Sequence, residues 1–290
     1  MTRTAISPRF AIKTLENTLY LGRVDLTRAR SALAGSRFAD VEWVADTGST
    51  NADLMAAARS GAGERVLGAD HQTSGRGRLG RPWEAPDGAS ILMSILVRCD
   101  LGVASGHLVT TALGLAAVDA VEAVTDFHAG LKWPNDLVAV GAGPDGGDRK
   151  FAGVLAESVV VGDRLAAVVV GIGVNVNWPD DLPDELAEIA TSLRHLVGHD
   201  VDRTDLVVAI LRGFEHHVAL VDTASGAELL RRAYLERSAT VGRPVRVELG
   251  DRTITGAAVD VDVAGRLVVE ADHQRHALSV GDVVHLRPLD

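Results

Sequence analysis

The spacing of apolar and polar positions along the chain predicts both strands and helices. Alternating or continuously apolar runs indicate strands, which in chain order are 41–45, 65–69, 90–98, 130–133, 137–140, 151–161 and 164–176. Apolar residues at helical spacing indicate helices, which in chain order are 25–33, 52–59, 106–124, 205–221 and 227–238. The chain is therefore expected to be an α+β protein in which a mixed β-sheet is flanked by helices.

The pattern changes near residue 240, where short alternating strands begin. Turns separate these strands at 249–251, 263–265 and 271–273. Regular short strands of this kind predict a small β-barrel. The expected domains are an N-terminal extension, a main domain and a small C-terminal domain, at residues 1–40, 41–239 and 240–290.

Composition excludes several classes of protein. The chain has 290 residues, of which 47% are hydrophobic, and its formal net charge of −10 argues against general binding of nucleic acid. The single cysteine, Cys99, excludes internal disulfides and fits a reducing compartment. The N-terminus lacks the apolar segment of a signal peptide, and the longest apolar run, 165–174, is too short to span a bilayer. A soluble cytoplasmic protein is expected.

Basic residues gather in one segment, residues 72–83 (QTSGRGRLGRPW). Three glycines and three arginines fall within its residues 75–81. Glycine lets the backbone approach a ligand closely, and arginine presents a planar fork that matches carboxylates and phosphates. The segment therefore predicts a cationic binding loop, with a solvated turn of the same composition as the alternative.

The same glycines satisfy the dinucleotide-binding pattern G-x-G-x-x-G, which requires a strand before it and a helix after it. Residues 65–69 can supply the strand. Residues 81–88 cannot supply the helix, because they contain two prolines and a glycine. We therefore reject a nucleotide-binding fold, which makes an oxidoreductase the least favoured of the alternative functions.

Two further segments group side chains that are suited to chemistry. Ser49, Thr50 and Asn51 precede a predicted helix, where they either cap the helix or hold a polar ligand head. Residues 132–136 (KWPND) combine a cation, an aromatic ring, an amide and a carboxylate. The alternative for this second segment is a simple turn stabilised by the asparagine or aspartate side chain.

Glycines also lie inside two predicted strands, at 150–157 (KFAGVLAE) and 171–177 (GIGVNVN). Glycine within a strand often marks the close approach of a ligand or of another segment. His195 and His199 are four residues apart but lack an acidic partner, so they do not form a metalloprotease motif. With no Cys/His cluster in the sequence, we expect no metal held by the protein itself.

Four segments together resemble the signature segments of biotin protein ligases. They are GRGRLGRPW after Gln72, KWPNDL at 132–137, KFAGVLAE at 150–157 and GIGVNVNWP at 171–179. They follow the family's order, and the resemblance covers roughly residues 41–290. It implies a biotin/lipoate ligase-like catalytic domain and an SH3-like C-terminal barrel.

The resemblance also implies a reaction. Biotin is activated by ATP, with Mg²⁺, to biotinoyl-5′-AMP and pyrophosphate. Biotin is then transferred to a lysine of the biotin carboxyl carrier domain of a biotin-dependent carboxylase.

The same resemblance implies roles for individual residues. Lys150 is expected to reach the biotin carboxylate and the α-phosphate, and Arg78 to hold the acyl-adenylate. Asp136, the third catalytic residue, is expected with Asn135 to orient either the acceptor lysine or a Mg²⁺-bound phosphate. The other residues implied to bind biotin or its adenylate are Ser49, Thr50, Asn51, Gln72, Gly75, Arg76, Gly77, Trp133, Gly153 and Asn175. Of these, Trp133 and Gly153 are expected to flank the acyl chain.

Some features depart from the family pattern. The usual Asp-Ser-Thr-Asn is two residues longer after Asp46, and the loop at 141–148 is rich in glycine. The DNA-binding domain of the family's regulatory members is not expected here, which indicates a monofunctional ligase that binds neither DNA nor membranes. The rival interpretations are a lipoate-type ligase of the same fold and a nucleic-acid-binding module. The intact GRGRxGR loop favours biotin, and the acidic net charge disfavours nucleic acid.

Overall fold

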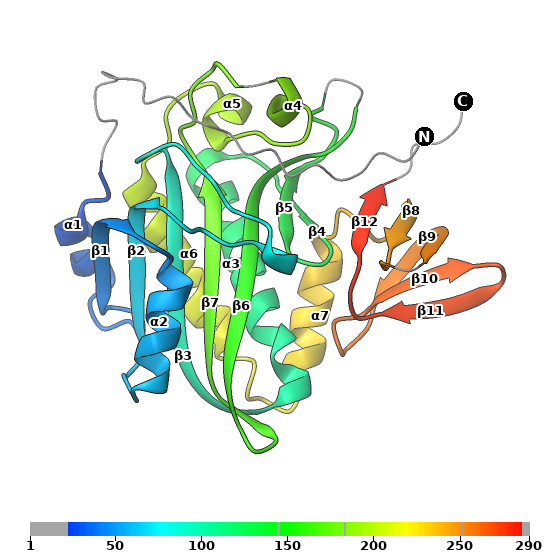
Figure 1. The fold of residues 1–290 in the computed structure, drawn as a ribbon, viewed down its shortest axis with the longest axis horizontal. Helices are drawn as coiled ribbons and strands as arrows, with labels where there is room; N and C mark the ends of the chain where they lie inside the picture. Colours follow the sequence, from blue (N-terminus) through cyan, green and yellow to red (C-terminus); the bar gives the residue numbers. More distant parts are fainter. Residues whose placement is uncertain (1–22, 144–145, 183, 251, 286–290) are drawn as a thin grey trace.

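A computed structural model describes residues 23–143, 146–182, 184–250 and 252–285 of the chain (Figure 1). The strands form a seven-stranded mixed sheet and a five-stranded antiparallel sheet. The expected α+β class is confirmed. Lys13 and residues 144–145 of the glycine-rich loop lie outside the described residues.

The seven-stranded sheet has the order β1-β2-β3-β7-β6-β5-β4. β1 and β2 are parallel, and every other neighbouring pair is antiparallel. Every strand expected before residue 180 is present, and several continue past their apolar runs because backbone pairing with a neighbour continues there. The strands are β1 (Val41–Thr47), β2 (Arg65–Gln72), β3 (Ser90–Gly102), β4 (Gly130–Lys132), β5 (Asp136–Ala139), β6 (Arg149–Val161) and β7 (Arg164–Asn175).

Helices cover both faces of this sheet (Figure 1). On one face lie α3 (His107–Thr125) and α6 (Arg203–Val218), and on the other lies α2 (Thr50–Arg59). Together with the preceding turn, α3 is long and apolar enough to cross a membrane, but 61% of this stretch is buried as the main core helix. The remaining helical elements are α1 (Leu26–Ala32), α4 (Asp184–Ala187), α5 (Leu193–Val197), α7 (Gly226–Glu236) and the 3₁₀ turns η1 (Arg78–Gly80) and η2 (Val103–Ser105).

Two of these helices were not expected from the sequence. α4 has four residues and α5 has five, so neither is long enough for helical periodicity to appear. All five helices that were expected are present, and each begins within two residues of its predicted start.

Alternation of side chains along the strands gives the two faces of the sheet different cores. The core beneath α3 and α6 includes Ile91, Met93 and Ile95 of β3 and Val168 and Val170 of β7. The intervening residues form a smaller core with α2, made of Leu54, Met55, Ala58, Leu96, Ala167 and Val169. Beyond the N-terminus of α2, this second face carries small and polar residues instead, Ser94, Gly171 and Gly173 among them. That change in residue type leaves room for a site.

Residues 23–40 pack against the main domain. Asp25 caps α1 and donates its backbone N–H to Thr204 Oγ1 at 3.0 Å. Phe38 is fully buried, and its ring centroid lies 5.1 Å from that of Phe214 on α6. The described part of the expected extension is therefore attached to the main domain rather than separate from it.

The five-stranded sheet lies beside α7 at the C-terminal end of the chain (Figure 1). Its strands, in the order β11-β10-β9-β8-β12, are β8 (Pro244–Glu248), β9 (Thr253–Val261), β10 (Leu267–Ala271), β11 (Gln274–Leu278) and β12 (Asp282–His285). The short strands are confirmed, but the described residues do not close into the expected barrel. β11 and β12 are the two edges of an open sheet, because β12 pairs with β8 and its ends contact the main domain. The division at residue 240 stays a prediction.

Candidate functional site

A cavity of about 700 Å³ lies on the small and polar part of the sheet face. It is bounded by the N-terminus of α2, the β4–β5 turn and residues 75–83, called the Gly/Arg loop below. This volume is typical of sites for small molecules. All but one of the residues predicted from the sequence line it, namely Ser49, Thr50, Asn51, Gln72, Arg76, Gly77, Arg78, Trp133, Asn135, Asp136, Lys150, Gly153 and Asn175.

Gly75 is the exception. It is buried within the loop, and its carbonyl oxygen accepts a hydrogen bond from the Trp83 backbone N–H at 2.9 Å. A Cβ at this position would lie 2.3 Å from the Trp83 carbonyl oxygen. Gly75 therefore allows the two ends of the Gly/Arg loop to approach each other and does not line the cavity.

A buried polar cluster lies at the N-terminus of α2. The helix begins after Ser49, whose side chain caps it as predicted by accepting from the Ala52 N–H. Gln72 Oε1 accepts from the backbone N–H of Thr50 at 2.8 Å and from its hydroxyl at 3.0 Å. Thr50 Oγ1 also lies 2.7 Å from Ser94 Oγ. Because each group has a fixed partner, the cluster is preorganised to present polar atoms to the cavity.

Asn51 extends this cluster across the sheet. Its Oδ1 accepts from Ser94 Oγ at 2.6 Å, and its Nδ2 donates to Glu157 Oε2 at 3.1 Å. Arg76 Nη2 donates to the same Glu157 oxygen at 3.3 Å, which ties the Gly/Arg loop to β6. A Cβ at Gly171 would lie 2.2 Å from Asn51 Oδ1, so glycine is required there for Asn51 to lie against β7.

Trp83, at the end of the Gly/Arg loop, lies over two paired glycines. Gly153 of β6 is directly opposite Gly173 of β7. A Cβ at Gly173 would come within 2.4 Å of the Trp83 ring, and one at Gly153 within 3.2 Å. The glycines inside these strands therefore mark a close approach, as the sequence indicated, and the approaching group is the indole of Trp83.

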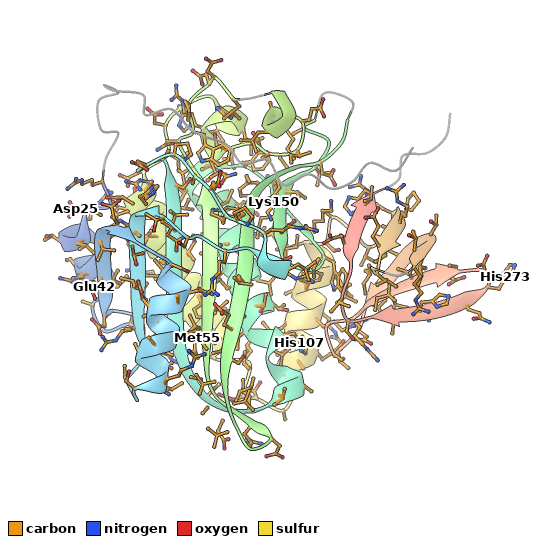
Figure 2. The ribbon with its side chains drawn as sticks, viewed as in Figure 1. Asp25, Glu42, Met55, His107, Lys150 and His273 are labelled. Carbon is orange, nitrogen blue, oxygen red and sulfur yellow. The ribbon has the colours of Figure 1, made fainter. Side chains whose placement is uncertain are left out.

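Lys150 is the second residue of β6, at the end of the sheet where the cavity lies, and it is labelled in Figure 2. Its Nζ lies 2.7 Å from Asp136 Oδ1 and 5.1 Å from the centre of the Trp83 ring. Its backbone is held on both sides, since its N–H donates to Ile189 O and its carbonyl accepts from the Thr191 N–H, both at 2.9 Å. The structure thus presents a lysine on a rigid strand between a carboxylate and an aromatic face.

Two further cations face the same space. Arg78 Nη1 donates to Asn135 Oδ1 at 3.2 Å, and burial lowers the pKa of its guanidinium while Asp282 and Asp136 oppose that change. Burial also lowers the pKa of Lys132, which lines the cavity from β4. Within the described residues, Lys132 forms no ion pair and no hydrogen bond through its side chain. Together with Lys150 these groups favour a ligand that carries negative charge.

Trp133 lines the cavity and is also attached to the C-terminal sheet. Only 3% of this residue is exposed, and its indole Nε1 donates to Gly265 O of the C-terminal sheet at 3.0 Å. Its ring anchors the β4–β5 turn to that sheet, and Trp83 supplies the aromatic face over the glycines. Asn175 is buried, donates from Nδ2 to Thr191 O at 3.0 Å, and lines the cavity.

Sequence reasoning missed Trp83, Ser94 and Glu157 as residues of the site, and it singled out Lys132 as the cation of the KWPND segment without assigning it a role. Ser94 and Glu157 had a usable signal, since each is a polar residue in a largely apolar strand, and burial of a polar group requires a partner. Other cavity residues that were not predicted are Asp181, Leu182, Leu186, Ile189 and Ala190. No group of three or more His, Cys, Asp or Glu side chains in the described part of the chain could hold a metal ion.

Comparisons with known proteins agree with this geometry. The model of the biotin/lipoate A/B protein ligase family matches residues 57–175, and that of the biotin protein ligase C terminal domain matches residues 240–286. A biotin–[acetyl-CoA-carboxylase] ligase of Mycobacterium tuberculosis is 41% identical over 261 residues, which are 88% of this chain and 92% of that protein. The bifunctional ligase/repressor BirA of Bacillus subtilis is 33% identical over 207 residues, 70% of this chain and 61% of its own length.

Solved structures give the same result. A biotin protein ligase from Aquifex aeolicus, in complex with biotin and ATP, has a TM-score of 0.70 and 27% sequence identity. The alignment covers 86% of this chain and 100% of that one. The likeness therefore extends over both sheets.

Proposed function

The chain belongs to the biotin protein ligase family, and on this premise we propose how its cavity carries out two reactions. The enzyme is an ATP-dependent ligase that activates biotin as biotinoyl-5′-AMP with release of pyrophosphate. It then joins biotin to a lysine of a carboxylase carrier domain. The observation that supports the residue roles best is the meeting of Lys150, Asp136 and Arg78 with the polar cluster of α2 in one cavity.

We assign the ureido ring of biotin to the polar cluster. This ring is neutral but polar, so its burial requires hydrogen bonds. Thr50 and Asn51 are nearly fully buried and are held by Gln72 and Ser94, which supports a fixed set of donors and acceptors for the ring. The apolar acyl chain would then run beside the Trp83 indole, which covers the paired glycines, toward Lys150.

Adenylation requires two anions to approach each other. A carboxylate oxygen of biotin attacks the α-phosphorus of ATP, an O–P bond forms, and the bond to the β-phosphate breaks to release pyrophosphate. Preorganised positive charge lowers the barrier to such a step. We assign this task to Lys150, assisted by Lys132 and Arg78, and we assign Asp136 to holding the Lys150 ammonium group in place.

The mixed anhydride hydrolyses if water reaches it, so the intermediate must be covered. The Gly/Arg loop is suited to this, because it crosses the cavity and is attached through Arg76 to Glu157 and through Arg78 to Asn135. In the second step the carrier lysine attacks the acyl carbon. A C–N bond forms, the acyl C–O bond breaks, and AMP leaves.

A divalent ion fits this scheme as part of the ATP complex. Mg²⁺ prefers oxygen ligands and usually keeps several waters while binding phosphates. The described residues offer no carboxylate cluster to hold it, and Asp136 and Asp282 at the cavity are engaged with Lys150 and Arg81. We propose that Mg²⁺ enters bound to ATP and adds charge at the phosphates, and that the enzyme acts in the cytoplasm on a carboxylase carrier.

The test is ATP–pyrophosphate exchange with biotin and, in parallel, with lipoate, without any carrier. We expect exchange that depends on biotin, followed by biotinylation when a carrier domain is added. Exchange with lipoate alone would show that biotin is not the substrate. Exchange with neither acid would show that the enzyme does not carry out the proposed adenylation.

A further inference from the structure

A buried chain of hydrogen bonds connects the C-terminal sheet to the β4–β5 turn of the active site. The backbone N–H of Trp133 donates to Thr240 Oγ1 at 3.0 Å. Thr240 Oγ1 lies 3.2 Å from His285 Nε2, and His285 Nδ1 lies 2.6 Å from Asp148 Oδ2. The four residues come from the turn, the segment between α7 and β8, the end of β12 and the β5–β6 loop. None of them except Trp133 lines the cavity.

Asp148 is the charged end of this chain. Its side chain is only 4% exposed, and it accepts from Arg243 Nη1 at 2.8 Å and from the Gly141 N–H at 3.1 Å. Burial opposes ionisation, but the hydrogen bonds from His285 and Gly141 and the charge of Arg243 outweigh it and lower the pKa of Asp148 to about 2. Asp148 is therefore a carboxylate at neutral pH, which only accepts hydrogen bonds.

This carboxylate fixes the tautomer of His285. Because Asp148 only accepts, Nδ1 of His285 carries the hydrogen, and Nε2 of the neutral ring is left as an acceptor. The Thr240 hydroxyl then donates to Nε2, and its oxygen remains free to accept from the Trp133 N–H. Every polar atom along the chain has a partner of the right kind only while His285 is neutral.

The charged groups around His285 support the neutral state. Burial lowers the pKa of its imidazole, and Lys132 and Arg243 add to this effect while Asp148 opposes it. Lys132 ends β4, Arg243 lies between α7 and β8, and Asp148 ends the β5–β6 loop. Protonation would make both ring nitrogens donors, so the Thr240 hydroxyl would lose its acceptor.

We propose that His285 is a positioning residue for adenylation, which acts through Thr240 to fix the Trp133 peptide and so hold Asp136 against Lys150. Trp133 is the first residue of the turn that leads from Lys132 to Asp136, and its indole is held by the same sheet at Gly265. The C-terminal sheet thereby determines where the partner of the catalytic lysine lies. This inference rests on the roles proposed above for Lys150 and Asp136.

The experiment compares Thr240→Val with Thr240→Ser in the full chain, measuring kcat and KM of biotin-dependent ATP–pyrophosphate exchange together with Tm. Valine keeps the shape but leaves the Trp133 N–H without an acceptor, so we expect kcat to fall about tenfold. Serine keeps the hydroxyl and should restore the rate. The KM for biotin should stay within about twofold, because the α2 cluster is untouched. His273→Ala is the matched control, since His273 lies at the exposed outer tip of the same sheet (Figure 2).

The pH profile separates positioning from simple stability. A histidine whose pKa is lowered in the folded protein makes its full contribution to folded-state stability above its ordinary pKa of about 6.5. This contribution is lost as the pH falls through the pKa of the folded protein. Protonation of the folded enzyme follows the lowered pKa of His285, so we expect kcat of the parent enzyme to decline only as the pH falls through that value, which lies below about 6.5. His285→Asn retains a donor to Asp148 but has no titrating ring, so that decline should disappear.

The outcomes are distinguishable. If Thr240→Val lowers Tm but leaves kcat unchanged, or if His285→Asn keeps the acid decline of the parent, His285 does not position the turn. The second comparison decides the matter if Thr240→Val fails to fold. No exchange by the parent enzyme with biotin would instead refute the proposed function itself.

Discussion

The floor and the lid of the cavity hold their polar groups in different ways. The floor, formed by β3, β6, β7 and the N-terminus of α2, holds Asn51 by hydrogen bonds to Ser94 and Glu157 and buries it almost fully. The lid is the Gly/Arg loop, where the side chains of Arg76 and Arg81 are 46% and 56% exposed and each has one ion-pair partner.

This difference corresponds to two tasks. An exposed ion pair contributes about 0–1 kcal/mol to the stability of the fold. A buried network in which every polar group has a hydrogen-bond partner instead holds its side chains in one arrangement. A segment with few buried contacts opens at low cost, as substrate entry requires. The floor should therefore determine the chemical step and the substrate, and the lid should determine how long the intermediate is kept.

The largest effect is expected at the floor, from Lys150→Ala. Loss of one preorganised charge at a developing anion typically costs about 10²-fold or more in rate, so pyrophosphate exchange should fall by that factor. Arg164→Ala is the control, because Arg164 is an exposed cation at the far end of the neighbouring strand β7. Near-normal exchange by Lys150→Ala would remove Lys150 from the chemistry.

The next largest effect is expected from Gly171→Ala, which changes the shape of the floor and leaves its charge unaltered. Gly171→Ala puts a Cβ within 2.2 Å of Asn51 Oδ1, so Asn51 must move and its contacts to Ser94 and Glu157 weaken. Overpacking of this kind costs about 1–3 kcal/mol, and we expect the KM for biotin to rise about tenfold or more. Gly63→Ala should change nothing, since no atom lies within 4 Å of a Cβ there. An unchanged KM in Gly171→Ala would mean that Asn51 does not contact biotin.

Much of this floor could be predicted from local signals in the sequence. Ser49 or Thr50 was expected to cap the helix, and Ser49 does so. Gly153 was expected to mark a close approach. Both signals depend on residues near each other in the chain or on the backbone itself. The strands and long helices were predicted for the same reason. The lipoate alternative was set aside on the GRGRxGR loop, and the comparisons favour biotin.

Contacts between distant residues could not be predicted. Arg76 meets Glu157 across 81 positions, and Trp133 meets Gly265 across 132. No periodicity encodes such pairs, so neither the contact of Trp133 with the C-terminal sheet nor the position of Trp83 over the glycines was predicted. The open C-terminal sheet was missed for the same reason, because strand spacing predicts turns but not which edges pair.

A smaller effect is expected at the lid, from Arg78→Gly. The guanidinium would no longer offer a fork to the adenylate phosphate, and release of biotinoyl-5′-AMP should become about tenfold faster. Arg78→Lys retains the charge without the fork and should lie between the variant and the parent. The measurement is the rate at which preformed intermediate leaves the enzyme. If Arg78→Gly retains it as long as the parent does, Arg78 is not a ligand of the phosphate.

The smallest effect is expected where the lid meets the C-terminal sheet, at the Arg81–Asp282 ion pair. Both side chains are more than a third exposed, so the pair is screened by solvent and salt. We expect Arg81→Ala and Asp282→Ala each to speed release of the intermediate by about threefold or less, and the double variant to be no faster than either single one. The effect should vanish at high salt, because exposed charges are then screened within a few ångströms. Additive effects in the double variant would show that the two residues act separately, and a salt-resistant effect would show that Arg81 acts through packing rather than charge.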